Sequence, residues 1–342
     1  MEKLFFYVLL AWLTIAQPVF GAVGITLPKS TAPTYVQIAL FLEDVSLVNP
    51  WLQTLEIDAT LIMQWQDDSI KRRFSKLTYF TGPNLNQTLT RENIWSPFVE
   101  ILNARKGRLI EGQALIVKPN GSVQYIERFN AEVFAKMNFR KFPFDAHDIT
   151  IQFRSLLYNS GQLRFIPLNP YEGIAVSAQL AEWGLKGYSS YVATSSDLQF
   201  HKDHSQYNVS LTLARHSNYY LSKILLPMII LGILSCSILW ISREQLGSKL
   251  GVSISCLVAI IAYQWVIKDS LPKVNYQVLL GSIISTTFFF ACSVIFLTIL
   301  FNSLGKHGKL KLSEILEHTA RWLMPLIYTV ALIIIFAYYH VY

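Results

Sequence analysis

The sequence of 342 residues is poor in charge and in cysteine. Only 15% of its residues are charged, whereas 52% are hydrophobic and the mean hydropathy is +0.35. This composition excludes a disordered chain, because disordered chains carry too little apolar surface to build a core. The three cysteines, Cys236, Cys256 and Cys292, all fall within apolar stretches. We therefore expect no disulfide framework in the more polar part of the chain.

The sequence also lacks the short motifs of several enzyme classes. It contains no glycine-rich phosphate loop, no Gly-x-Ser-x-Gly nucleophile motif and no His-Glu-x-x-His zinc motif. His201 and His204 stand close together, but two histidines without a third ligand are a weak sign of a metal site. We therefore predict that the protein is not an enzyme and that it needs no metal or cofactor.

The formal net charge of +7 is concentrated in the part of the chain that follows residue 218. Lysines and arginines there stand beside long apolar segments, a distribution typical of the cytoplasmic loops of membrane proteins. A nucleic-acid partner is not expected, because proteins that bind nucleic acids gather their basic residues on one face of a soluble domain.

The first 22 residues are predicted to be a secretory signal peptide. Lys3 precedes an apolar run from Leu4 to Ala16, and small residues follow at Gly21 and Ala22. An uncleaved membrane anchor is the alternative, although the apolar run is short for a span. A signal peptide would place the next domain, residues 23–218, outside the cytoplasm.

Residues 23–218 show the alternating pattern of a β-sandwich. Apolar residues occupy the odd positions from Leu55 to Trp65, from Ile149 to Phe153 and from Tyr207 to Leu213. Alternation of this kind predicts strands with one face in a core and the other in water. Asn120-Gly121, between two such runs, is a strong signal for a hairpin turn. Several short strands with such turns predict an immunoglobulin-like sandwich.

Residues 219–342 contain four long apolar stretches, at about 219–241, 249–268, 277–301 and 321–340. Each is close to the ~20 residues that a helix needs to cross a bilayer. The basic residues between the first and second stretches, and between the third and fourth, predict that these two loops are cytoplasmic. The N-terminal domain and the C-terminus would then both lie outside.

The second apolar stretch carries a mixed seam at helical spacing. It is small or polar at its cytoplasmic half and apolar higher up, and its members are Ser248, Gly251, Ser255, Val258, Ala262, Trp265 and Asp269. Such a seam faces either a neighbouring helix or water. Lys268 and Asp269 at its outer end favour water, and several copies in a ring would line a pore with a hydrophobic constriction.

These features bring the sequence close to a known family. The chain resembles, over about residues 35–342, the pentameric ligand-gated ion channels of the Cys-loop receptor superfamily, and specifically their bacterial branch. The most specific match is Phe142-Pro143-Phe144-Asp145, preceded by the run from Gln124 to Phe129. The further matches are Ile94-Trp95-Ser96-Pro97, Trp65-Gln66-Asp67, Arg215, Leu226-Pro227-Met228 and Leu271-Pro272-Lys273.

The resemblance implies an α+β membrane protein, in which an extracellular immunoglobulin-like β-sandwich is followed by a four-helix transmembrane bundle, assembled as a homopentamer. Ala135 and Ile149 stand where animal receptors carry the disulfide of the Cys loop, and the connection from Asn302 to Ala320 is short. Both features point to the prokaryotic type, for which we expect an inner-membrane, multi-pass protein with both the N-terminal domain and the C-terminus in the periplasm or extracellular space.

The resemblance also assigns residues that would couple the sandwich to the helices. Asp145 would pair with Arg215 at the joint, against the alternative of an ordinary surface ion pair. The full set of expected coupling residues is Trp51, Phe142, Pro143, Phe144, Asp145, Arg215, Pro272 and Lys273.

The family's ligand pocket lies between neighbouring sandwiches. The residues carried over to it are Leu102, Arg128, Arg154, Leu156, Tyr158, Phe200 and Tyr207. Leu102 and Leu156 replace aromatic residues that amine receptors use for cation–π contacts, and the two arginines favour a small anionic or aromatic-acid ligand. Solvated strand-face arginines are the alternative. Protons are a second candidate activator, although Gln53 and Ile260 replace the acidic residue and the histidine of proton-opened relatives.

The expected permeant ions are monovalent cations. Ser248 replaces the glutamate of the cation-channel pattern, but Asp269 supplies an acidic ring at the outer mouth, and no Pro-Ala pair of the anion-channel pattern precedes Lys249. The predicted function is therefore a ligand-gated cation channel, with pH modulation as an open alternative, and its expected partners are membrane lipids and a small-molecule ligand or protons. The alternative is a non-conducting membrane-anchored sensor or binding module with a β-sandwich outside.

Overall fold

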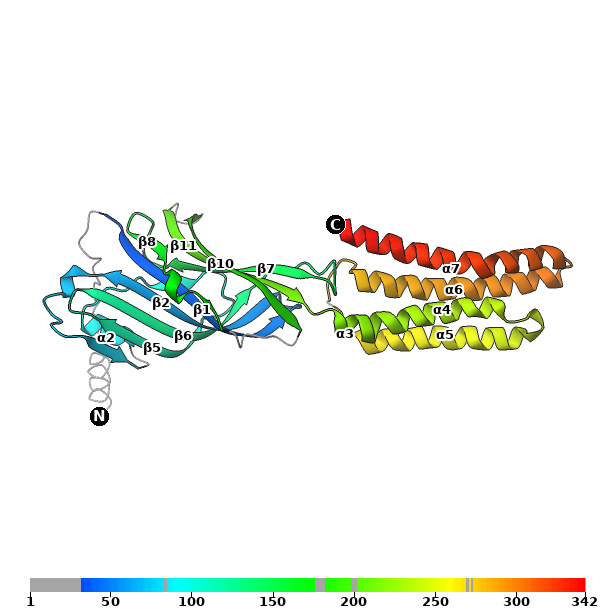
Figure 1. The fold of residues 1–342 in the computed structure, drawn as a ribbon, viewed down its shortest axis with the longest axis horizontal. Coiled ribbons are helices and arrows are strands. Elements are labelled where there is room, and N and C mark those ends of the chain that lie inside the picture. The colour runs from blue at the N-terminus through cyan, green and yellow to red at the C-terminus, as the bar shows by residue number, and fades with distance from the viewer. Residues whose placement is uncertain are drawn as a thin grey trace, which may run out of the picture.

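The computed structural model describes residues 32–82, 85–175, 182–197, 202–268, 271 and 273–341. The expected signal peptide at 1–22 lies outside the described residues, and so do Phe200, Asp269 and Pro272. Figure 1 shows an elongated molecule with a β-sandwich at one end and helices side by side at the other. The predicted fold class is confirmed at this level.

Two sheets form the sandwich. One has the order β3-β5-β6-β2-β1-β8, with β9 also pairing with β1, and the other has the order β10-β11-β7-β4. The strands are β1 (Thr34–Asn49), β2 (Thr54–Gln66), β3 (Thr78–Thr81), β4 (Val99–Ile101), β5 (Leu109–Val117), β6 (Ser122–Phe134), β7 (Ala146–Ser155), β8 (Leu163–Pro167), β9 (Gly173–Ile174), β10 (Trp183–Asp197) and β11 (Lys202–Arg215). A short helix, α2 (Leu85–Arg91), precedes β4.

The core of the sandwich follows the alternation in the sequence. On β2, the odd positions from Leu55 to Trp65 are buried, whereas the even positions between them are half-buried. The same parity holds on β7, where Ile149, Ile151 and Phe153 are buried. Side chains of successive strand residues point to opposite faces of a sheet, so each strand contributes every second residue to the core.

The predicted Asn-Gly turn connects β5 to β6. Val117 pairs with Val123 across the hairpin, and the Lys118 amide donates to the carbonyl oxygen of Ser122 at 2.9 Å. Gly121 has φ +82°, which favours glycine, and a Cβ there would lie 2.7 Å from the Asp67 carbonyl oxygen. The hairpin therefore needs glycine for both its backbone angle and its close packing.

Within the part of the chain that the structure describes, four helices are long and apolar enough to cross a membrane: Asn218–Trp240, Leu246–Ile267, Leu279–Lys306 and Leu310–Val341. The first is built from α3 (Asn218–Tyr220), a π-helical turn (Leu221–Leu225), α4 (Leu226–Ser237) and a 3₁₀ turn (Ile238–Trp240). The others are α5 (Leu246–Ile267), α6 (Leu279–Lys306) and α7 (Leu310–Val341). The helix that contains the fourth apolar stretch begins at Leu310, about ten residues before that stretch, and its first turns carry charged side chains.

The helices pack as a bundle whose two ends differ. In Figure 1 the C-terminal end of α7 lies beside the sandwich, and the α4–α5 and α6–α7 connections lie at the far end. The hydroxyls of Thr287 on α6 and Tyr328 on α7 form a hydrogen bond of 2.9 Å, and Tyr328 also packs against Gly232 of α4. Cys236 and Cys256 are buried and Cys292 is half-buried, all as free thiols.

Gly121→Ala tests the hairpin. We expect the substitution to lower the free energy of unfolding by about 1–2 kcal/mol, because alanine resists positive φ and its Cβ would press on the Asp67 carbonyl. Gly107→Ala is the matched control, since a Cβ there meets no atom within 4 Å. Thermal unfolding of the purified proteins measures both, and equal melting temperatures for the two variants would contradict the interpretation.

Candidate functional site: the domain joint and the second membrane helix

The seam predicted on the second span lies on the exposed side of α5. Ser248, Gly251, Ser255, Val258, Ala262 and Trp265 are all exposed. The buried positions of this helix are different residues, namely Lys249, Ser253, Cys256, Ile260 and Ile267. The seam therefore does not pack against other helices of its own chain. The seam is left open to its surroundings, to a helix of another chain or to water.

The sandwich and the helices meet at a buried ion pair. Asp145 follows the tip of the β6–β7 loop, and Arg215 is the last residue of β11, immediately before the first membrane helix. The Arg215 Nε donates to Asp145 Oδ1 at 2.9 Å, and both side chains are almost fully buried, at 2% and 1% exposure. This is not the ordinary surface pair that the sequence left open, because solvent does not screen it.

Aromatic rings enclose the guanidinium of Arg215. Its central carbon lies 4.0 Å from the ring centre of Trp183, 4.8 Å from Phe142 and 5.7 Å from Tyr220. Phe142 and Tyr220 also pack edge to face, with ring centres 4.8 Å apart. Cation–π contacts of this kind are strongest where water is excluded. Phe142, a residue of the β6–β7 loop, thus packs directly on the first membrane helix.

His147 completes the joint, through a contact that the sequence did not predict. Its Nε2 lies 2.7 Å from Asp145 Oδ2, and its ring packs against Phe139 and Trp183. Burial by itself would raise the pKa of Asp145, but the hydrogen bonds from His147 and Arg215 outweigh it and hold that pKa below the ordinary value of 3.8. The available signal was its position two residues after Asp145, at the start of β7.

The same loop caps the third membrane helix. The amide of Leu279 donates to the Arg140 carbonyl oxygen at 2.9 Å, and the amide of Leu280 donates to the Phe142 carbonyl oxygen at 3.2 Å. The first amides of a helix have no partner within the helix, and Val278 provides no side-chain cap to α6. The Phe139 amide also donates to the Tyr276 hydroxyl at 3.0 Å. The loop is therefore hydrogen-bonded to the start of α6.

A second contact joins the β1–β2 loop to the segment that follows α5. The Lys273 ammonium lies 3.9 Å from the ring centre of Trp51, which is 52% exposed. Trp51 and Leu271 also line a cleft of about 500 Å³, together with Phe142, Arg215 and Tyr220. Seven of the eight expected coupling residues, all but the undescribed Pro272, thus meet in one region or belong to the loop that forms it, although the Phe144 side chain is exposed.

The two arginines of the expected ligand pocket bind carboxylates of their own chain. Arg154 of β7 lies 3.2 Å from Glu100 of β4. Arg128 of β6 lies 2.8 Å from Glu43 of β1 and 3.3 Å from Glu111 of β5. Because each guanidinium already has a carboxylate partner, a ligand carboxylate would compete with an existing ion pair.

The other expected pocket residues differ in exposure. Leu102 and Leu156 are exposed, at 39% and 60%, and are available to a ligand at the surface. Tyr158 is largely buried against Trp95, with ring centres 5.4 Å apart. Tyr207 is fully buried, and its hydroxyl donates to Glu172 at 2.8 Å. Tyr207 therefore belongs to the sandwich core in this structure rather than to a surface pocket, as the parity of its strand requires.

Comparison with known proteins adds a family and relatives. Residues 25–217 match the family described as neurotransmitter-gated ion-channel ligand binding domain. The chain is 26% identical over 283 residues to a proton-gated ion channel of Gloeobacter violaceus, which covers 81% of this chain and 76% of that protein. It is 23% identical over 264 residues to the gamma-aminobutyric acid receptor subunit alpha-2 of Rattus norvegicus, covering 74% of this chain and 56% of the subunit.

A glutamate-gated chloride channel of Drosophila melanogaster is a third relative. It is 23% identical over 254 residues, which cover 71% of this chain and 53% of that channel. The chain thus spans little more than half the length of these two animal relatives.

Asp145→Asn tests the buried joint. We expect the free energy of unfolding to fall by about 3 kcal/mol at pH 7, because the amide removes the buried counter-charge of Arg215 and leaves only the largely exposed Glu182 carboxylate at 3.4 Å. The pKa of Asp145 is lowered in the folded state, so its contribution is present above pH ~4 and is lost as the pH falls through the folded-state pKa. Melting temperatures from pH 7 to pH 3 should therefore differ most at neutral pH and converge in acid.

Asp148→Asn on the same strand is the control. Asp148 is exposed and accepts a hydrogen bond from Thr212 at 2.6 Å. Asp148→Asn should lower the free energy of unfolding only slightly at any pH. An Asp145→Asn variant that is no less stable than this control would contradict the role of the joint.

Proposed function

The chain belongs to the neurotransmitter-gated ion-channel family, and we propose that five copies form a ligand-gated ion channel whose pore is lined by α5. The observation that carries the proposal is the exposed seam of α5. Polar Ser248 and Ser255 share one helix face with apolar Val258, and that face is uncovered in the single chain. A ring of such helices would enclose a water-filled lumen.

We place the constriction of this pore at Val258 and Ala262. Both residues are exposed on the seam, above Ser255, and Trp265 lies one turn farther toward the outer end with 76% exposure. An apolar ring can stop ion flow by losing its water when the radius is small. Tilting or rotating α5 would change this radius, and α5 is tied to the joint through the segment that carries Lys273.

The proposed permeant ions are monovalent cations. Asp269, at the outer end of the seam, would form a ring of carboxylates at the mouth, and acidic rings concentrate cations. The animal relatives include a chloride channel, so sequence similarity by itself does not favour either sign of ion. The choice between cations and anions must therefore depend on the sign of the charged side chains at the two mouths of the pore.

The proposed activator is a small molecule that binds between neighbouring sandwiches. Arg154 with Glu100, and Arg128 with Glu43, present both signs of charge at two places, one on each sheet of the sandwich. A small anionic or aromatic acid would exchange with one of these carboxylates. Protons are the second candidate, because the Gloeobacter relative is named a proton-gated ion channel.

We propose that activation reaches the pore along two contacts. The Phe142 loop caps α6 and packs on Tyr220 of the first membrane helix, while Trp51 contacts Lys273 beyond the outer end of α5. A shift of the sandwich would therefore move three membrane helices together. A non-conducting sensor would have no need for a polar seam that is left open to a ring of copies.

We further propose a prokaryotic inner-membrane location, with the sandwich and the C-terminus in the periplasm. The N-terminal sequence pattern of residues 1–22 and the basic residues of the connections at the far end of the bundle support this orientation.

Reconstitution into planar bilayers tests the channel and its selectivity. Current should appear on changing pH or on adding small organic acids or amines to the sandwich side. Under a NaCl gradient the reversal potential should follow the sodium equilibrium potential. The absence of current under all conditions would favour the non-conducting sensor, and a reversal potential that follows chloride would overturn cation selectivity.

Trp51→Ala tests the outer coupling contact. Without the ring, the Lys273 ammonium loses its cation–π partner, so we expect the activator concentration for half-maximal current to rise several-fold. Trp51→Phe keeps an aromatic face and should restore most of the response. Concentration–response curves at equal amounts of surface protein measure the effect, and identical curves for wild type and Trp51→Ala would argue against this route.

A further inference from the structure

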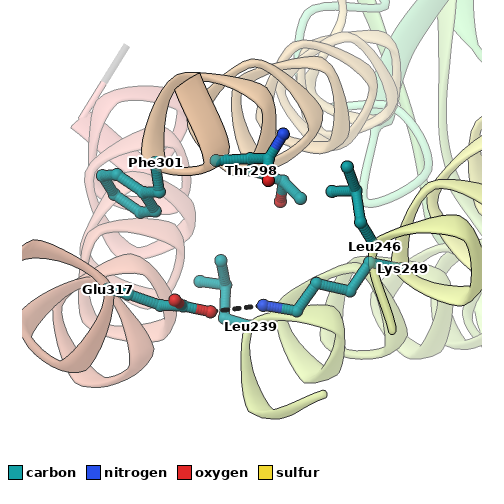
Figure 2. Close-up of a pocket in the computed structure, with 7 residues that line it drawn as sticks. Leu239, Leu246, Lys249, Thr298, Phe301 and Glu317 are labelled. Atoms are coloured by element: carbon teal, nitrogen blue, oxygen red, sulfur yellow. Dashed lines mark hydrogen bonds and ion pairs between the residues drawn. The ribbon is translucent and has the colours of Figure 1, made fainter. Parts of the chain in front are cut away.

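A buried ion pair joins the inner end of α5, the proposed pore helix, to α7, the last helix of the chain. The Lys249 ammonium of α5 donates to a carboxylate oxygen of Glu317 on α7, and the two side chains are only 4% and 5% exposed. Figure 2 shows the lysine extended across the bundle toward this carboxylate. Lys249 lies in the first turn of α5, next to the α4–α5 connection, which is at the end of the bundle away from the sandwich (Figure 1).

All four membrane helices enclose this pair. Leu239 comes from the first span, Leu246 from the start of α5, and Thr298 and Phe301 from α6, around a cavity of about 20 Å³. A cavity of this size holds about one water molecule. The pair is therefore shielded from bulk solvent, and the two charges interact through protein rather than through water.

Lys249 lies on the other side of α5 from the pore seam. Its neighbours Ser248 and Gly251 are exposed on the seam, whereas Lys249 is buried in the bundle. The lysine side chain is long and flexible, and an unpaired lysine extends toward water when water is within reach. At the inner end of α5, the water within reach would be that of the pore mouth.

The charge of Lys249 matters for ion choice because the pore is a ring. Five ammonium groups at one narrow mouth would raise the local potential, attract anions and repel cations. Ser248 offers no charge of the opposite sign at this end, and the exposed Glu244 before α5 would offset the lysine only one for one. A cation-selective pore is therefore favoured when the lysine charge is neutralised or kept away from the lumen.

We propose that Glu317 is a specificity-determining residue that acts through Lys249. It holds the lysine in the bundle interior and neutralises it there, so that the inner mouth is free of positive charge and admits cations. This inference rests on the proposed cation channel. Glu317 does not touch the permeating ion, so it is a positioning residue.

Stability by itself is a weak reason for this pair. Burying two charges costs about as much as their attraction returns, and apolar residues of similar size often serve as well. Removing only one partner is different, because it leaves the other charge buried and unpaired. Lys249 without Glu317 would therefore leave the interior.

A second contact fixes α7 beside the pair. Arg321, one turn after Glu317, donates from Nε to the Leu239 carbonyl oxygen at 2.9 Å. That carbonyl lies in the last turn of the first span. The Ser313 hydroxyl, one turn before Glu317, donates to the Phe301 carbonyl oxygen of α6 at 2.5 Å. The carboxylate of Glu317 is thus held in position from both sides along its helix.

Reversal potentials of four variants test the proposal. In bilayers under a NaCl gradient, Glu317→Gln should lower the sodium-to-chloride permeability ratio several-fold. The double variant Lys249→Gln with Glu317→Gln should return to the wild-type ratio, because no lysine is then left to reach the mouth. Lys249→Gln alone should stay cation-selective. Glu314→Gln, at an exposed position one turn earlier on α7, is the control and should resemble wild type.

Chemical labelling provides a readout that does not depend on current. A water-soluble amine-reactive reagent applied to the purified full-length protein should modify Lys249 much more slowly than the exposed Lys309, as measured by mass spectrometry. In Glu317→Gln the labelling of Lys249 should rise several-fold. If this variant does not assemble, the exchanged pair Lys249→Glu with Glu317→Lys serves instead, and it should keep the wild-type permeability ratio.

Three results would overturn the inference. The first is an unchanged permeability ratio in Glu317→Gln, and the second is a double variant that shifts as far as the single one. The third is a wild-type Lys249 that is labelled as fast as Lys309, which refutes the inference whatever the protein conducts. Failure of the proposed function gives a different result, namely a wild-type protein that carries no current or follows chloride while Lys249 stays protected.

Discussion

The loop from Phe139 to Asp145 is the constraint on which the rest of the molecule depends. A helix within hydrocarbon satisfies its own backbone groups except at its ends, so its ends are where another domain can bind it. This loop binds at the starts of two helices: its carbonyl oxygens accept the first amides of α6, and Asp145 binds the Arg215 side chain just before the first span. Its position therefore fixes where two membrane helices begin relative to the sandwich.

The fold could be predicted from local patterns where one physical rule dominated. Parity along β2 and β7, the Asn-Gly turn and the four apolar stretches each depend on neighbouring residues, and they gave the sandwich and the bundle. The start of α7 at Leu310 could not be read in this way, because its first turns are amphipathic and are stabilised by contacts with α6. The His147 contact likewise depends on Trp183, which is distant in sequence.

Some parts of the candidate site could be predicted from the sequence, and others could not. The exposed seam of α5 follows from helical spacing, and the Asp145–Arg215 contact followed from the family resemblance. Tyr207 shows the limit of transferring residues by motif, because strand parity assigned it to the core and the structure places it there. Lys249 shows another limit. In the sequence, Lys249 looks like one more basic residue of the connection between the first two apolar stretches. The ion pair with Glu317 becomes visible only when the four helices are packed together.

The hydroxyl of Ser255 has a consequence for how the protein is made. It donates to the Gly251 carbonyl oxygen of its own helix at 2.9 Å, so its proton is already satisfied before any other subunit arrives. A newly inserted single chain would otherwise expose an unpaired polar group to lipid, at a cost of several kcal/mol. Because the oxygen keeps free lone pairs, the same residue can bind water after the ring closes. The seam is thus compatible with both the monomer in lipid during biogenesis and the hydrated interior of the finished assembly.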